Sequence, residues 1–355
     1  MRGRGRSSLT ALCLVAAGMA IVPHAGARSA DTKCRLNEEK ARWIQRALAG
    51  WERGSAEFLR LPPAPLPWIV LFDTTCVWHL APDPSRLSGV QPDSVDLRFQ
   101  GRPVLVWVRP HHGTVELPDG SSVPVAPTVY AAFSRALERP YFVLSLPEVF
   151  RSDPAAARDP RLAERILSVV SHEILHTRQL PDLQRAIDAL GQEAELPGRI
   201  DDNVIETRFS GDSTFRAAFE VERDLLYEAA FEPEVSRARG VATRAVARIR
   251  ERRARHFAGA DEVYGRLEEL FLNLEGAAEW LRFKLHQADP GDLESDAEIV
   301  GFIRGRSNEW VQDEGLALFL LLDRFERNWQ PRLLGPDLAS PIDALEEALH
   351  QDEGD

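Results

Sequence analysis

The chain has 355 residues, and its 55 acidic side chains against 43 lysines and arginines give a formal net charge of −12. A net negative protein is poorly suited to nucleic acid or to anionic lipid, so both are excluded as the main partner. The length is sufficient for a full hydrophobic core, built as one large unit or as two tightly packed layers.

The N-terminal segment has the three parts of a secretory signal peptide. Its first six residues carry three arginines, Leu9–Val22 is an apolar run too short to span a bilayer, and Ala25-Gly26-Ala27 supplies small residues for cleavage. We therefore expect cleavage near Ala27 and an exported protein, periplasmic or secreted, with a mature net charge of about −15. No later segment approaches membrane-spanning length, so we expect no stable membrane insertion.

Removing the signal peptide, residues 1–27, leaves Cys34 and Cys76 as the cysteines of the mature chain. In an oxidising compartment, two cysteines without a competitor indicate one disulfide. It would join the first helix to the strand region after Trp68, and the loop-entropy account gives such a closure a value of roughly 4 kcal/mol. Two buried free thiols are the alternative.

Residues 28–150 are expected to form an N-terminal helix and a small mixed sheet. The helix is predicted over 37–59, and a proline-rich extended linker follows at 62–67. Apolar, β-branched and aromatic runs predict strands, with a turn at Asp119-Gly120 between the later ones. The predicted strands are 68–72, 103–108 and 141–146.

Residues 151–355 are expected to be predominantly helical. One helix is predicted to begin at Asp159-Pro160 and to stop at Pro181, and another to run from Asp261 to about Gln287. The basic run 237–255 still traces one apolar face, which favours a solvated amphipathic helix over a binding patch. A small sheet followed by a helical half predicts an α+β fold, with 28–355 forming one compact unit.

The helix that begins near Asp159 contains an H-E-x-x-H motif, His172-Glu173-Ile174-Leu175-His176. Histidines four positions apart lie on one helix face, so both imidazoles can reach a single ion. Glu173 is rotated by about 100° from His172, close enough to hold a water on that ion without ligating it. The pattern favours a Zn²⁺ site with Glu173 as general base over two accidental histidines on a surface helix.

A catalytic zinc normally has three protein ligands, so a third is required. A third histidine following the motif is excluded, because Gln179 and Asp182 occupy the positions where glycine and histidine would be needed. Two later glutamates precede a glycine, Glu275 in Glu-Gly-Ala-Ala and Glu314 in Glu-Gly-Leu-Ala. We favour Glu275, because the helix of Glu314 is apolar nearly all round and resembles a packing helix.

Both glutamate segments resemble the E-G-x-A signature of gluzincins, the clan of thermolysin-like peptidases and zinc aminopeptidases. The resemblance covers residues from about Trp68 to Trp329. Over this range, the order of helices and strands resembles that of an uncharacterised exported bacterial branch of the clan. It implies a zincin-like fold, Glu275 as third ligand, and Glu279 as an acidic residue that orients a zinc histidine; a solvated Glu279 is the alternative. In such a fold, Tyr141–Leu146 would form the lip of the cleft and pair with an extended peptide; an ordinary core strand is the alternative.

Two features depart from this resemblance. His176 and Glu275 are separated by 99 positions, which requires a large helical insertion, and Arg178 stands where the clan usually has an apolar residue. Gluzincins also place a Tyr or His donor at the substrate oxygen. Candidates exist here, but no motif selects one of them: Tyr227, Tyr264, His256 and His286.

The sequence therefore predicts an exported zinc-dependent metallohydrolase of gluzincin type, most favourably a peptidase acting on peptide or protein substrates. Zinc would be held by His172, His176 and Glu275, with Glu173 as the catalytic base. Two alternatives stay open. One is a non-catalytic exported binding or scaffold protein that retains a zinc site. The other is a zinc amidase or esterase acting on cell-wall or small-molecule substrates.

Overall fold

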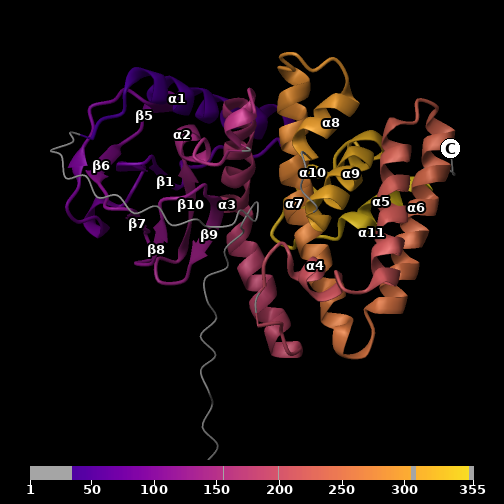
Figure 1. The fold of residues 1–355 in the computed structure, drawn as a ribbon. Helices are drawn as coiled ribbons and strands as arrows, with labels where there is room; N and C mark the ends of the chain where they lie inside the picture. The colour runs from indigo at the N-terminus through magenta and orange to yellow at the C-terminus, as the bar shows by residue number, and fades with distance from the viewer. Residues whose placement is uncertain (1–33, 155, 199, 305–308, 352–355) are drawn as a thin grey trace, which may run out of the picture.

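A six-stranded sheet fills one side of the molecule and a group of helices fills the other in the computed structural model (Figure 1). The structure describes residues 34–351 except 155, 199 and 305–308, so the predicted signal peptide and its cleavage site lie outside the described residues. The arrangement is the predicted α+β fold. The strands in sheet order are β3 (Gln91–Pro92), β6 (Val106–Pro110), β2 (Cys76–Leu80), β1 (Trp68–Phe72), β10 (Arg139–Ser145) and β9 (Val129–Ser134).

The central strands are buried on both faces. Ile69 and Leu71 of β1 belong to the main core, while Trp68, Val70 and Phe72 belong to a smaller core on the opposite face. The hairpin of β7 (Thr114–Glu116) and β8 (Ser122–Pro124) contributes to that smaller core. Burial on both faces explains why β1 is apolar without alternation. The short hairpin of β4 (Arg98–Phe99) and β5 (Arg102–Pro103) stands apart from this sheet.

The expectation that residues 141–146 form a cleft lip that pairs with a peptide is wrong, and the alternative of a core strand is confirmed. β10 pairs in parallel with β1 on one side and antiparallel with β9 on the other. Because both of its backbone edges are already hydrogen-bonded, β10 has no free edge for an extended peptide. The strand at this edge of the sheet is β9, which was not predicted from the sequence.

The sheet is covered by two long helices. α1 (Glu38–Arg53) begins at Asn37, whose side chain accepts a hydrogen bond from the Lys40 N–H, and a short π-helix (Gly54–Phe58) continues it. α3 (Leu162–Glu193) packs on β9 and β10 with one face and on the helical half with another (Figure 1). The short α2 (Pro147–Phe150) connects β10 to this region.

The predicted stop at Pro181 is also wrong, because α3 continues through Pro181 for another three turns. Proline lacks an N–H and costs roughly 3 kcal/mol inside a helix. Leu183 and Ile187 follow on the buried face, with 0% and 2% of their surfaces exposed. Their burial offsets the loss of one backbone hydrogen bond.

The remaining helices pack around α7 (Glu262–Ala288) and α9 (Trp310–Phe325), on the side of α3 that is turned away from the sheet (Figure 1). The insertion expected between His176 and Glu275 comprises the rest of α3 together with α4, α5 and α6. No helix in the described ranges is long and apolar enough to cross a membrane. The helices are α4 (Val204–Phe209), α5 (Ser213–Phe231), α6 (Val235–His256), α7 (Glu262–Ala288), α8 (Asp296–Arg304), α9 (Trp310–Phe325), α10 (Gln330–Leu333) and α11 (Pro341–Gln351).

Cys34 and Cys76 form a disulfide with a Cα–Cα distance of 5.8 Å. The bond joins the chain just before α1 to the first residue of β2, 42 positions later. The alternative of two free thiols is thereby excluded in this structure.

Candidate metal centre

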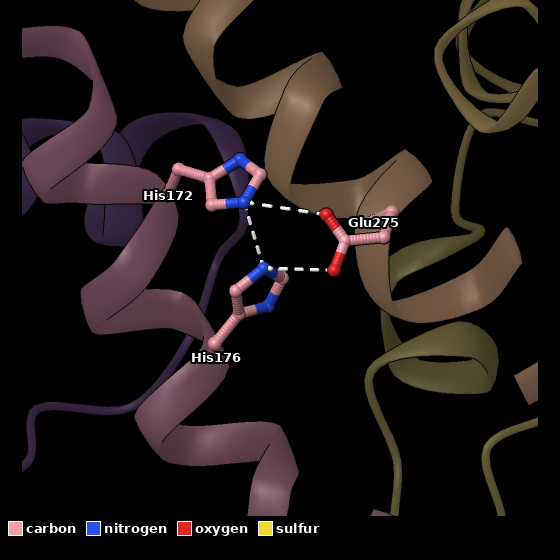
Figure 2. A group of neighbouring side chains, drawn as sticks. All are labelled: His172, His176 and Glu275. Carbon is pink, nitrogen blue, oxygen red and sulfur yellow. Dashed lines mark hydrogen bonds and ion pairs between the residues drawn. The ribbon is translucent and has the colours of Figure 1, made fainter. Parts of the chain in front are cut away.

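His172, His176 and Glu275 converge between α3 and α7 (Figure 2). The two histidine Nε2 atoms are 2.7 Å apart, and each lies 3.3 Å from a different oxygen of Glu275. The three side chains have 3%, 0% and 1% of their surfaces exposed. Among the described residues, this is the group of histidine and acidic side chains whose ligand atoms lie close enough to hold one metal ion.

A chain of polar contacts behind the ligands fixes the orientation of His172. Its Nδ1 lies 3.1 Å from Oε1 of Glu279, one turn after Glu275 on α7. Arg282 donates to both oxygens of Glu279 at 2.8 and 2.9 Å, and also to Ser168 Oγ at 3.2 Å. Outer partners of this kind hold the imidazole ring in place and raise its basicity. The structure therefore places Glu279 beside the histidine rather than in solvent.

The second histidine has a partner that sequence reasoning missed. His176 Nδ1 is 3.4 Å from Oε1 of Gln179, which is buried one turn further along α3. In the sequence, Gln179 served only to exclude a third-histidine motif, which would need glycine at that position. Its spacing of i, i+3 from His176 was the available signal for this contact.

The site carries an excess of carboxylate that attracts positive charge. Burial lowers the pKa of His172, but Glu275 and Glu279 outweigh burial and raise that pKa to about 10. Burial raises the pKa of Glu275, but His176 and His172 outweigh it and hold the pKa well below its ordinary value. A proton on an imidazole thus balances the charge in the absence of an ion. A metal cation would replace that proton, since ligating histidines are neutral.

Glu173 lies beside this group without joining it. Only 1% of its surface is exposed, and one carboxylate oxygen has no hydrogen-bond partner among the described residues. The backbone N–H of Ala131 in edge strand β9 donates to the carboxylate. Burial raises the pKa of Glu173, opposed by the two nearby histidines. A carboxyl whose pKa is raised in this way is suited to accept and return a proton near neutral pH.

Glu314, the rival third ligand, is placed in a different cluster. Arg252 is buried among three glutamates, with Nε 2.5 Å from Glu222, Nη1 2.7 Å from Glu268 and Nη2 3.7 Å from Glu314. Burial and the neighbouring Glu222 raise the pKa of Glu314 well above its ordinary value. Arg252 belongs to the basic run expected to be solvated, yet only 2% of its surface is exposed.

The two Glu-Gly segments meet where α7 crosses α9. A Cβ placed on Gly315 would lie 2.8 Å from Gly276 Cα, and a Cβ on Gly276 would lie 2.8 Å from the Gly315 carbonyl oxygen. Only glycine permits this approach at both positions. The contact sets the distance between the helices, with Glu275 directed to the histidines and Glu314 to Arg252.

The segment before α4 is buried near the site. Ile200, Asp201 and Asp202 have 8%, 3% and 4% of their surfaces exposed. Burial raises the pKa of Asp202 well above its ordinary value, and the charges of Glu275, Glu309, Asp201 and Glu173 raise it further. The Asp202 carboxyl is therefore within electrostatic range of both the candidate ligand Glu275 and the candidate base Glu173. The sequence did not predict this proximity, because residues 194–203 have no periodic pattern.

The four candidate oxygen-binding donors have partners elsewhere in the described structure. The Tyr227 hydroxyl donates to Asp313, and His256 lies 3.3 Å from Asp212. Tyr264 and His286 pack edge-on against Phe209 and Phe302 respectively. The structure therefore selects none of the four for a role beside the metal ligands.

Comparison with known protein families, curated proteins and solved structures found no match to this chain. The functional assignment therefore depends on the geometry of the site.

Proposed function

We propose that the chain is an exported zinc-dependent hydrolase with a zincin-like, gluzincin-type catalytic region, and that its substrates are peptides or proteins. The observation that carries the proposal is the His172–His176–Glu275 group with Glu173 beside it. Three nitrogen and oxygen ligands with one position left open is the arrangement of catalytic zinc sites. Export after cleavage near Ala27 agrees with the Cys34–Cys76 disulfide, because disulfides persist in oxidising compartments.

The donor set fits a divalent cation. Glu173, Glu275 and Glu279 are buried within one region, and the buried Arg282 is paired with Glu279. One oxygen of Glu173 has no hydrogen-bond partner among the described residues, which is costly unless another group satisfies it. A purely structural zinc site would favour four ligands including sulfur, whereas Cys34 and Cys76 are bonded to each other.

A zinc ion bound there would supply Lewis acidity, which lowers the pKa of water toward about 7 and stabilises negative charge on a carbonyl oxygen. The residues of the chain do the rest. Glu173 accepts the proton of the attacking water and returns it to the leaving amine. Glu279, held by Arg282, keeps His172 oriented. Edge strand β9, whose Ala131 already donates to Glu173, takes the peptide-pairing role first expected of β10.

Substrate entry requires part of the structure to move. All four catalytic side chains have 3% or less of their surfaces exposed, and the charges of Glu275 and Glu173 act on the buried Asp202 carboxyl. In this proposal, displacement of residues 200–203, the segment that carries Asp202, opens one side of the site. The same segment would exclude water from the reaction once substrate is bound.

The test measures bound metal and peptide turnover together. Mature protein should contain one equivalent of zinc, and His172→Ala or Glu275→Gln should lose it. Glu314→Gln is the matched control, because it alters the equivalent Glu-Gly pair on α9 and should keep the metal. Glu173→Gln should keep the metal and lose turnover of a mixed peptide library by at least about a hundredfold.

Three outcomes separate the readings. Bound zinc without turnover of peptides, amides or esters would support the binding or scaffold protein. Turnover of amides or esters but not peptides would support the zinc amidase or esterase. Wild-type protein without bound metal, or zinc retained by both His172→Ala and Glu275→Gln, would overturn the metal site itself.

A further inference from the structure

A cavity of about 230 Å³ lies behind the helix that carries the metal ligands. Ile174 and Arg178 of α3 line it, and they are rotated by about 200–240° from His172, so the cavity is on the face turned away from the metal site. The proline-rich linker and the start of β10 form the opposite wall. The lining residues are Trp51, Ala64, Pro65, Leu66, Pro67, Arg139, Pro140, Ile174, Thr177 and Arg178.

Two arginines, Arg139 and Arg178, are among the residues that line this cavity, and no acidic residue lines it. Arg178 is partly buried, and its Nη1 donates to the Pro62 carbonyl oxygen at 2.9 Å. The Arg139 guanidinium lies over the Trp68 ring at 5.8 Å, and its charge acts on Asp83. Burial is the cause that shifts the pKa of Arg178, and no acidic group acts on it.

Arg178 differs in this respect from the fully buried arginines of the same protein. Arg252 and Arg282 are both paired with glutamates. A partly desolvated cation without a counter-ion is costly, so buried charges are usually paired or bind a ligand.

We propose that this cavity binds a small organic carboxylate. Arg178 and Arg139 bind the carboxylate group, since a guanidinium fork matches its planar geometry. Trp51, Leu66 and Ile174 provide an apolar wall for the body of the ligand, and rigid prolines fix the shape of the pocket. The volume admits molecules about the size of benzoate rather than a peptide. The proposal is independent of whether the metal centre is catalytic.

The test is calorimetric titration of full-length mature protein with benzoate, isobutyrate and benzamide, and with sulfate alone. Benzoate should bind with one site and a Kd on the order of 1 mM, whereas neutral benzamide should not bind. Arg178→Gln should weaken benzoate binding by at least about tenfold. Arg139→Gln tests the same pocket without removing the bond to the Pro62 carbonyl. Arg185→Gln, on an exposed part of the same helix, is the matched control and should bind like the wild type.

Three results would overturn the proposal. One is no saturable binding of either carboxylate up to about 50 mM, well above the expected Kd. The second is unchanged benzoate affinity in both the Arg178→Gln and the Arg139→Gln variants. The third is sulfate binding as tight as benzoate binding, which would show that the apolar wall contributes nothing and that the pocket only attracts anions.

Discussion

Replacing Gly315 by alanine tests the helix crossing that positions Glu275. The new Cβ would meet Gly276 Cα at 2.8 Å, Gly276 N at 2.9 Å and the Leu272 carbonyl oxygen at 3.2 Å. All three are backbone atoms, so no side-chain rotation can relieve the overlap. The optimal separation of non-bonded carbons is about 3.5–4.0 Å, so α7 and α9 must separate by several tenths of an ångström or more.

The expected net change is a loss of stability. Overpacking of a core costs about 1–3 kcal/mol, and a backbone-on-backbone clash belongs at the upper end. Alanine is favoured over glycine inside a helix by about 1 kcal/mol, which offsets part of that cost. We therefore expect Gly315→Ala to lower the free energy of unfolding by about 2 kcal/mol. Gly276→Ala should lose less, because Phe319 supplies two of its three close contacts and a side chain can shift.

The assay is urea unfolding of the metal-free protein, followed by zinc titration. The control is Gly240→Ala in α6, where a Cβ would have no neighbour within 4 Å. That variant should gain about 0.5–1 kcal/mol from helix propensity alone. Gly315→Ala should also bind zinc more weakly, since movement of α7 carries Glu275 away from the histidines. Equal stabilisation by Gly315→Ala and Gly240→Ala would refute the close crossing.

Three further predictions concern stability and access. Replacing Cys34 and Cys76 by alanine should lower the free energy of unfolding by up to about 4 kcal/mol, because the bond closes a loop of 42 positions; equal urea midpoints with and without the bond would contradict this. Burial, with a smaller effect of Arg109, lowers the pKa of His79 to about 4. Between pH 6.5 and 4, His79 therefore binds a proton in the unfolded chain but not in the folded chain. Stability should therefore be complete above pH 6.5 and fall by about 1.4 kcal/mol per pH unit between 6.5 and 4, and His79→Gln should flatten that slope in pH-dependent unfolding. A slope that His79→Gln leaves unchanged would assign the titration to other groups. In hydrogen exchange, amides of residues 200–203 should exchange faster than those around His172, and equal protection of both would argue against this route of substrate entry.

Much of the helical half follows from local pattern. α7 was predicted over 261–287 and is found at Glu262–Ala288, because its apolar stripe repeats without interruption. Pro181 shows the limit of a local rule: a helix breaker was overridden by burial of the residues that follow it. Edge strand β9 was missed for the opposite reason. Its sequence contains Ala131-Ala132, which has little intrinsic preference for a strand, and pairing with β10 determines its conformation.

The candidate site likewise has one part that the sequence predicts and another that it does not. The relation of His172, Glu173 and His176 is fixed within one helix turn, so the sequence is sufficient to predict it. The proximity of Asp202 to the site depends on tertiary packing, which no local periodicity encodes. The basic run 237–255 was predicted to be a solvated amphipathic helix, and no partner was predicted for Arg252. Its three carboxylate partners come from three other helices, so only tertiary packing reveals that it is buried.

Glu275 and Glu314 are each followed by glycine on a buried helix, so the Glu-Gly pair alone does not decide which of them faces the histidines. Arg252 decides it. Three acidic side chains surround that guanidinium, and Arg253 contacts only one of them, Glu268. Without Arg252, Glu222 and Glu314 would lose the buried cation that they contact, which is costly. Glu314 is therefore held on the far side of the Gly276–Gly315 crossing, and Glu275 is directed to His172 and His176. A buried arginine at position 252 is for this reason a stronger marker of the ligand choice than the glycine that follows each glutamate.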